Sequence, residues 1–171
     1  MAEQNKNVHG WKNNMDFGLE DEVNRAVFSS LVGEQYSNIY ELGNMKAIKG
    51  TDGKDEYSFD GVFEATKDDT KYLFVGEVKQ CLEAHDVRDA EARRVKLCKR
   101  LQDVKLGCCP SGARPYNSQT RQFLEYADFQ VVLYVAGGCI LPAAFTEAKA
   151  VGCAVVQPHG GRFRMDFPGS W

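Results

Sequence analysis

The sequence has no apolar run close to the roughly 18 residues that a membrane-spanning helix needs. Its N-terminal residues 1–14 are mostly polar and lack the hydrophobic centre of a secretory signal peptide. The first absence argues against helical membrane spans, and the second argues against export. We therefore expect an intracellular protein, in the cytoplasm or the nucleus, with no signal peptide and no membrane partner.

Cysteine occurs six times, but never as Cys-x-x-Cys and never with a histidine at the spacing of a zinc site. Disulfide frameworks are rare in chains that are not exported. The pattern therefore predicts reduced thiols in loops and in the core. The adjacent Cys108 and Cys109 leave a redox or metal role open, although plain loop thiols are the simpler explanation.

Marker residues of several enzyme classes are missing as well. The glycines do not fall at the spacing of a phosphate-binding loop or of a dinucleotide fingerprint. No Ser-His-Asp or Cys-His set stands out either. These absences argue against P-loop and dinucleotide-binding enzymes and against hydrolases with a nucleophilic triad.

An overall basic surplus is missing, since the formal net charge is −3. The segment 88–105 is the exception, because it carries seven Lys/Arg against three Asp/Glu and leaves the rest of the chain near −7. An acidic body with one basic helix suits a protein that meets phosphates on one side only. A solvated helix face explains this segment equally well.

What is present fits an ordinary globular protein, with 43% hydrophobic and 26% charged residues. A chain of 171 residues is long enough for one domain with a real core. We expect a polar N-terminal segment over 1–15 and a single domain over 16–171.

Hydrophobic spacing and turn residues predict a series of helices and strands. The first helix begins at Asp16 as N-cap, a last helix begins at Pro142 and ends at Gly152, and 106–120 reads as a loop. The predicted helices are 16–36, 86–105 and 142–150, and the predicted strands are 45–49, 59–66, 71–79, 129–135 and 153–156. Strands flanked by helices in this order predict an α/β protein, a three-layer domain with a mixed sheet.

The hairpin over 59–79 contains the most informative residues. If Thr66 pairs with Lys71, Asp60 lies opposite Glu77, and strand alternation puts Lys79 on the same face as Glu77. Opposed carboxylates are destabilising unless something neutralises them. A divalent cation bound together with a phosphate would neutralise them. The simpler alternative is an exposed hairpin with ordinary ion pairs and no bound ligand.

The order of elements, with Asp60 on the second strand and Glu77-Val78-Lys79 on the third, resembles the PD-(D/E)XK nuclease-like superfamily. The resemblance covers about residues 16–156 and implies a restriction-endonuclease-like core ordered αβββαβ. It also implies an active site with acids at positions 60 and 77, the lysine at position 79 and often a glutamate from the first helix. Phe59 departs from the pattern, which expects proline there.

In such a site, Asp60 and Glu77 would bind Mg²⁺ or Mn²⁺ through oxygen, and the carbonyl of Val78 and waters would complete the shell. The ion would acidify a water and polarise the scissile phosphate. Lys79 would orient or deprotonate that water, or neutralise charge at the phosphate. Beside a dication the pKa of Lys79 should fall, which makes a base role feasible.

On the first helix, helical geometry favours Glu20 as the fourth acid because it falls within the stripe of Val23 and Val27. Glu22 is the second choice for this acid. The acidic residues at positions 20–22 are explained nearly as well by a helix dipole that favours negative charge in the first turn.

Polar and basic residues near the site are candidates for substrate binding. Gln80 directly follows the motif, and Arg93, Lys96 and Arg100 share one flank of the basic helix as a track for a phosphate backbone. Arg94 falls near the apolar stripe and is expected to point toward the site or to lie along the surface.

We therefore expect a metal-dependent endonuclease acting on nucleic acid, with DNA preferred over RNA. So small a core would dimerise, act on a structural feature of the nucleic acid, or serve as a module of a larger protein. The main alternative is a catalytically inactive module that binds nucleic acid or protein. An unrelated α/β protein would require a different hairpin register.

Overall fold

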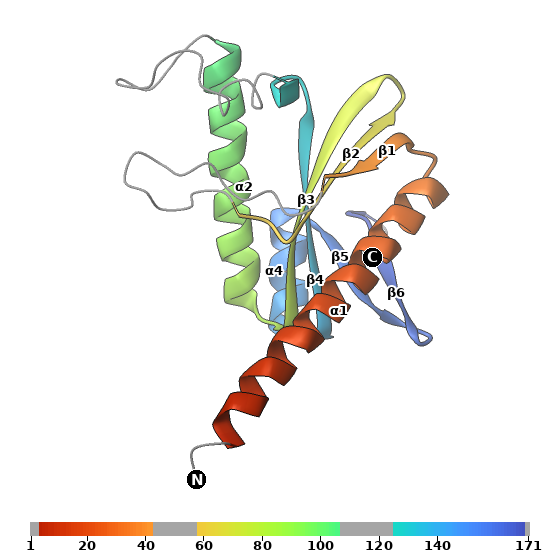
Figure 1. Cartoon of the computed structure of the whole chain (residues 1–171). Coiled ribbons are helices and arrows are strands. Elements are labelled where there is room, and N and C mark those ends of the chain that lie inside the picture. The colour runs from red at the N-terminus through yellow and green to blue at the C-terminus, as the bar shows by residue number, and fades with distance from the viewer. Residues whose placement is uncertain (1–3, 43–57, 107–124, 170–171) are drawn as a thin grey trace.

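The structure, a computed structural model, describes residues 4–42, 58–106 and 125–169, with side chains from residue 18 onward. The chain forms one mixed sheet with strands in the order β1-β2-β3-β4-β5-β6 (Figure 1). The described elements are α1 (Gln4–Gly33), β1 (Ser37–Glu41), β2 (Gly61–Lys67), β3 (Thr70–Leu82), α2 (Ala84–Lys105), β4 (Gln130–Ile140), α4 (Pro142–Val151), β5 (Ala154–His159) and β6 (Arg162–Asp166). Strand β4 is parallel to β3 and β5, while the other neighbours are antiparallel.

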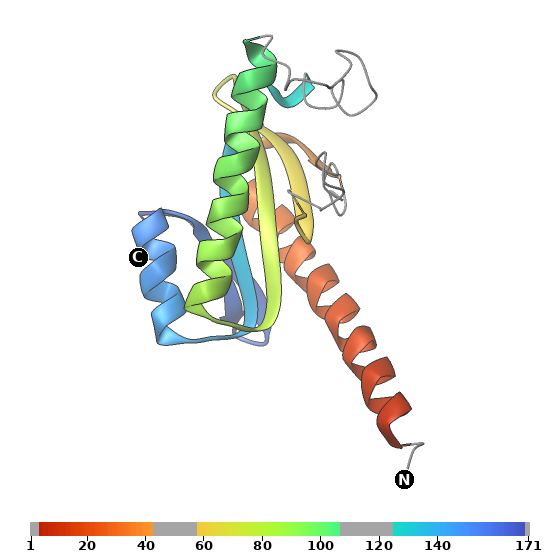
Figure 2. The ribbon, with the colours of Figure 1, turned by 90° about the vertical axis from the view of Figure 1, so that its left-hand side faces the viewer.

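Helices cover both faces of this sheet. Figure 2 shows α1 on one side and α2 with α4 on the other. Alternate side chains of β3 point to opposite faces of the sheet and so contribute to both cores. Leu73 and Val75 pack in the core under α2 and α4. Phe74 and Val78 pack in the core under α1. The predicted α/β class with a mixed sheet between helices is confirmed.

Several predicted elements match the observed ones. Helix α2 contains the predicted 86–105, and α4 begins with Pro142 in its first turn and ends at Gly152 in the left-handed conformation. Glycine suits that end because it has no Cβ to clash at positive φ. The predicted strands 129–135 and 153–156 correspond to β4 and β5.

The predicted start of the first helix is wrong. Helix α1 begins at Gln4 and passes through Asp16, so it crosses the expected boundary between residues 15 and 16. The apolar stripe of Val23, Val27 and Leu31, all fully buried, belongs to the half of α1 that covers the sheet. The N-terminal half extends past the sheet (Figure 2). A half-helix without a sheet beneath it needs no apolar stripe, so periodicity could not reveal it.

Two strands were not predicted, and one prediction is not addressed. Strand β1 begins directly after α1, and β6 pairs with β5 through a turn at Gly160 and Gly161, whose φ values are +57° and +77°. The predicted strand 45–49 and most of the predicted loop 106–120 lie outside the described residues.

The buried ring of Tyr134 on β4 shapes the sheet near the hairpin. A Cβ at Gly61 or at Gly76 would overlap the Tyr134 side chain, so both positions of this cross-strand pair require glycine. The ring fills the space under α1 at the point where β2 begins. It thereby closes the core directly beside Asp60.

Candidate functional site

The register of the β2–β3 hairpin is the predicted one. Thr66 pairs with Lys71, and the ladder ends at the pair of Gly61 with Gly76, one residue short of the predicted pair of Asp60 with Glu77. Between the strands, Asp68 and Asp69 have φ values of +49° and +61°. Two residues at positive φ form the tight turn whose twist matches an antiparallel hairpin.

Asp60 lies where the chain bends into β2. Its amide donates to the carbonyl of Gly76 at 2.8 Å, and the amide of Val78 donates to its Oδ2 at 2.8 Å. The carboxylate therefore lies at the end of the hairpin ladder, fastened to the backbone of β3. Burial raises the pKa of Asp60, and the nearby Glu77 raises it further. The Val78 amide and the cations Lys79 and Arg93 offset this only in part.

Glu77 is a buried carboxylate with two cationic partners. Its side chain is 6% exposed, with Lys79 Nζ at 2.7 Å from Oε1 and Arg93 Nη2 at 2.6 Å from Oε2. It occupies the face of β3 toward α2, because Val75 two residues earlier packs in the core under that helix. Buried charges persist only when they are paired, and here both oxygens are.

Lys79 interacts with both acids, through a salt bridge with Glu77 and through the charge of Asp60. Burial lowers the pKa of its ammonium, but the hydrogen bond to Glu77 and the charges of Glu77, Asp60 and Asp86 outweigh this, so the pKa is raised above its usual value. In this state Lys79 is a firmly protonated cation. A role as general base would need a bound dication to lower that pKa.

Arg93 is the one predicted substrate-binding residue of α2 that contacts the acids. Its guanidinium binds Glu77, its Cζ lies 5.8 Å from the centre of the Phe59 ring, and its Nε is buried without a partner among the described residues. Lys96 and Arg100 lie about one and two turns further along α2. Arg93 therefore belongs to the carboxylate cluster, and the use of all three residues as a phosphate track stays a prediction.

A small pocket brings the first helix into the site. It has a volume of about 190 Å³, and its lining consists of Leu19, Glu20, Asp60, Val78, Lys79 and Gln80. Glu20 thus lies with Asp60, as the helical spacing predicted. Glu22 instead lines a different cavity with Arg25 and Arg162.

Arg94 does not reach the acids. Its guanidinium binds both oxygens of Glu91, at 2.7 and 2.6 Å, and lies 3.6 Å from Cys98 Sγ. The hydrogen bond to Glu91 raises the pKa of Arg94, against the opposing effect of burial. The side chain is thus committed to its own helix and does not point toward the site.

Sequence reasoning missed a polar chain behind the pocket. Tyr134 donates its hydroxyl to Asn24 Oδ1 at 3.5 Å, and Asn24 Nδ2 donates to Glu41 Oε1 at 3.0 Å. Burial raises the pKa of Tyr134, and the acids Asp60, Glu41 and Glu20 raise it further, so the phenol stays protonated. Asn24 follows Glu20 by one helical turn inside the apolar stripe, which was the available signal.

The donor set fits a hard divalent cation in part. Asp60 and Glu20 place carboxylates around one pocket, and oxygen ligands of this kind suit Mg²⁺ or Mn²⁺. Glu77 completes such a set only if an ion displaces Lys79 or Arg93 from its oxygens. Among the residues with described side chains, no three His, Cys, Asp or Glu residues are already clustered as metal ligands.

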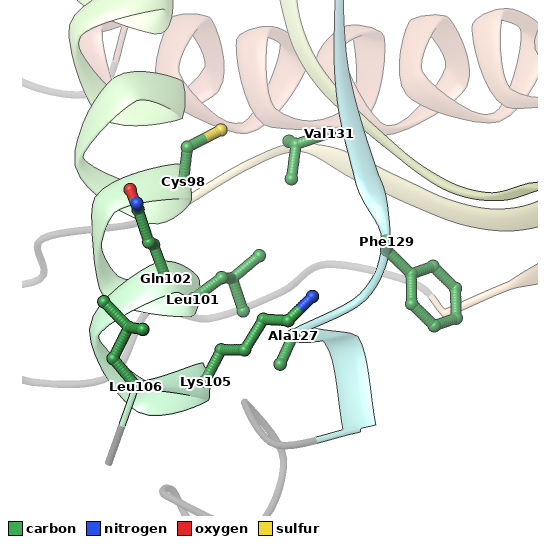
Figure 3. A pocket seen from close by; sticks show the side chains of 8 residues that line it. All are labelled: Cys98, Leu101, Gln102, Lys105, Leu106, Ala127, Phe129 and Val131. Carbon is green, nitrogen blue, oxygen red and sulfur yellow. The ribbon is translucent and has the colours of Figure 1, made fainter. Parts of the chain in front are cut away.

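A larger cavity lies elsewhere on the molecule. It has a volume of about 420 Å³ and lies between the last turns of α2 and the start of β4 (Figure 3). Its lining is largely apolar, with Leu101 and Phe129 among its residues, and it contains no carboxylate. The polar chemistry is concentrated at the other end of α2.

Comparisons with protein-family models, curated proteins and solved structures find no match to this chain. None of the helices in the described part of the chain is both long and apolar enough to cross a membrane.

Proposed function

We propose that the protein is a metal-dependent nuclease with a restriction-endonuclease-like fold, acting on nucleic acid and on DNA in preference to RNA. The observation that carries the proposal is the buried Glu77, which lies near Asp60 at the open end of the hairpin. Lys79 binds one of these acids and lines a pocket with the other. A cluster of this kind costs stability in any protein that does not use it.

The element order supports the fold part of the proposal. One helix precedes an antiparallel meander, β1 to β3, and α2 then crosses to β4, which runs parallel to β3. This is the αβββαβ order that the resemblance implies. Asp60 directly precedes the second strand, and Glu77 and Lys79 lie on the third, close to where the superfamily carries its catalytic residues.

Each residue of the cluster has a distinct role in the proposed reaction. A bound Mg²⁺ or Mn²⁺ would supply a metal-activated water and polarise the phosphodiester. Asp60, Glu20 and Glu77 would hold the ion, with the Val78 carbonyl as a further oxygen ligand. Lys79, protonated and 42% exposed, would bind the scissile phosphate and orient the water.

The electrostatics of Asp60 favour cation binding. Burial and the nearby Glu77 disfavour its charged form, as its raised pKa indicates. A dication that binds both carboxylates removes that repulsion, so binding and folding reinforce one another. Arg93 would release one oxygen of Glu77 and turn its guanidinium toward a phosphate.

The test is a cleavage assay with labelled duplex, single-stranded, branched and RNA substrates in Mg²⁺ or Mn²⁺. We expect activity on at least one substrate, reduced more than about 100-fold in Glu77→Gln and Lys79→Met. Lys67→Met is the matched control, because Lys67 forms a solvent-exposed pair with Glu34 at the other end of the hairpin. Activity that survives in both site variants would refute the proposed mechanism.

A non-catalytic module that binds nucleic acid or protein is the second candidate. The observation in its favour is that Lys79 and Arg93 already neutralise Glu77 without a metal. Calorimetric titration with Ca²⁺ or Mn²⁺ distinguishes the two, because only the nuclease requires an ion that depends on Asp60. Binding of nucleic acid without metal binding or cleavage would favour the module.

A further inference from the structure

Two cysteines meet where β3 and β4 run past the carboxylate cluster. The parallel register pairs Cys81 directly with Cys139. Both thiols are free and exposed to solvent. They lie 58 positions apart in the sequence, so no local spacing could have indicated the pair.

The geometry suits a bond between the two sulfurs. Neighbouring strands lie about 4.7–4.9 Å apart, and disulfides join residues whose Cα atoms are about 4.4–6.8 Å apart. Paired residues of in-register parallel strands also present their side chains to the same face. The Cys81 and Cys139 side chains are already in hydrogen-bond contact, which raises the pKa of the Cys81 thiol.

The other described cysteines are placed differently. Cys153 is buried, and burial raises its pKa to about 12. Cys98 lies at the cavity near the end of α2 (Figure 3), beside Arg94. Of the four described thiols, the two that share a strand register are also the two that solvent reaches freely.

We infer that Cys81 and Cys139 form a reversible redox site, which a peroxide closes to a disulfide and a small thiol reopens. One sulfur attacks the peroxide oxygen and becomes a sulfenic acid as the first water leaves. The second sulfur then displaces the sulfenic oxygen as another water. In total, two thiols lose two protons and two electrons, and one hydrogen peroxide becomes two waters.

The position of the site gives the disulfide a structural consequence. Cys81 is two residues beyond Lys79, so the bond would fasten the end of β3 to β4 just past the carboxylate cluster. Exposed disulfides are the readily reduced kind, which suits a site that opens and closes. The inference does not depend on metal binding or on nuclease activity.

The experiment oxidises the reduced full-length chain with hydrogen peroxide, blocks the remaining thiols with N-ethylmaleimide and maps tryptic peptides by mass spectrometry. We expect peptide 80–88 joined to peptide 122–149, at a mass two hydrogens below the sum of the two. Dithiothreitol should restore both separate peptides.

Cys81→Ser and Cys139→Ser should each abolish the joined peptide, whereas Cys98→Ser should leave its yield unchanged. All three changes keep a small polar side chain, so circular dichroism can verify that each variant folds. Separate maleimide adducts on the two peptides after oxidation would overturn the inference. Disulfides from either cysteine to Cys108 or Cys109, in place of the joined peptide, would overturn it equally.

Discussion

Asp60 and Glu77 lie near one another at the end of the hairpin, yet their carboxylates have different surroundings. Glu77 lies toward α2, with both oxygens bound by the cations Lys79 and Arg93. Asp60 lies beside the α1 pocket with Glu20, and its described hydrogen bond comes from the neutral amide of Val78. Glu77 is therefore ion-paired within the protein, whereas burial and the nearby Glu77 raise the pKa of Asp60.

The difference indicates which of the two carboxylates a bound cation would stabilise. A buried ion pair is costly to break, because removing one partner strands the other charge. A buried carboxylate near another acid is instead relieved by a cation or by a proton. We therefore expect loss of Glu77 to damage the fold, and loss of the Asp60 charge to help the metal-free fold while abolishing metal binding.

The largest effect should come from Glu77→Gln, which leaves Lys79 and Arg93 without their acid. Because both cations keep some solvent contact, the expected loss is about 2–3 kcal/mol of unfolding free energy, below the range for fully buried pairs. Urea unfolding in EDTA measures it. Glu147→Gln is the control, since its pair with the exposed Arg88 should contribute less than about 1 kcal/mol. Equal effects in the two variants would remove the distinction between the buried and exposed pairs.

Next in size is the stabilisation by a divalent cation. At a Ca²⁺ concentration ten times Kd, the wild-type chain should gain about 1.4 kcal/mol, seen as a rise in Tm. Asp60→Asn should remove most of that gain, whereas Glu22→Gln should retain it, because Glu22 lines a different cavity. If Ca²⁺ stabilised Asp60→Asn as much as the wild type, Asp60 would not be a ligand.

The change in unfolding free energy for Asp60→Asn in EDTA should be smaller than that for Glu77→Gln, opposite in sign and dependent on pH. Since the pKa of Asp60 is raised in the folded state, its contribution is fully present below the unfolded pKa near 3.8 and declines as pH rises through the folded pKa. The variant should match the wild type at pH 3 and exceed its stability at pH 7 by less than about 1 kcal/mol. Unfolding curves across this range test it, and a variant less stable than the wild type at pH 7 would contradict the expected sign.

The smallest expected change in unfolding free energy is that of Arg94→Gln, which differs from the change expected for the adjacent Arg93. Arg94→Gln removes an i,i+3 pair with Glu91 and should cost about 0.5 kcal/mol or less, with nuclease activity unchanged within about twofold. Arg93→Gln should cost more and should change activity, because it frees one oxygen of Glu77. Indistinguishable results for the two would show that the Arg93 contact does not matter.

The hairpin was predictable because its information is local. Alternating apolar residues and a short polar turn set the register, and a slip of one residue would have moved every side chain of the strand to the opposite face of the sheet. The helical angle between Glu20 and Val23 likewise placed Glu20 at the pocket. Strand β1 and the first half of α1 escaped prediction, because a strand with mostly exposed residues and a helix beyond the sheet carry no strong periodic signal.

The sequence by itself determined the residue types of the cluster, the register of the hairpin from Thr66 with Lys71 to Gly61 with Gly76, and the mixed α/β order. Only the tertiary structure decided that Arg93, not Arg94, binds Glu77, and that Cys81 meets Cys139. The physical reason is the separation along the sequence over which each kind of interaction acts. Periodicity and turn chemistry act over a few residues, whereas the seating of α2 on the sheet and the parallel pairing of β3 with β4 depend on how distant segments share one core.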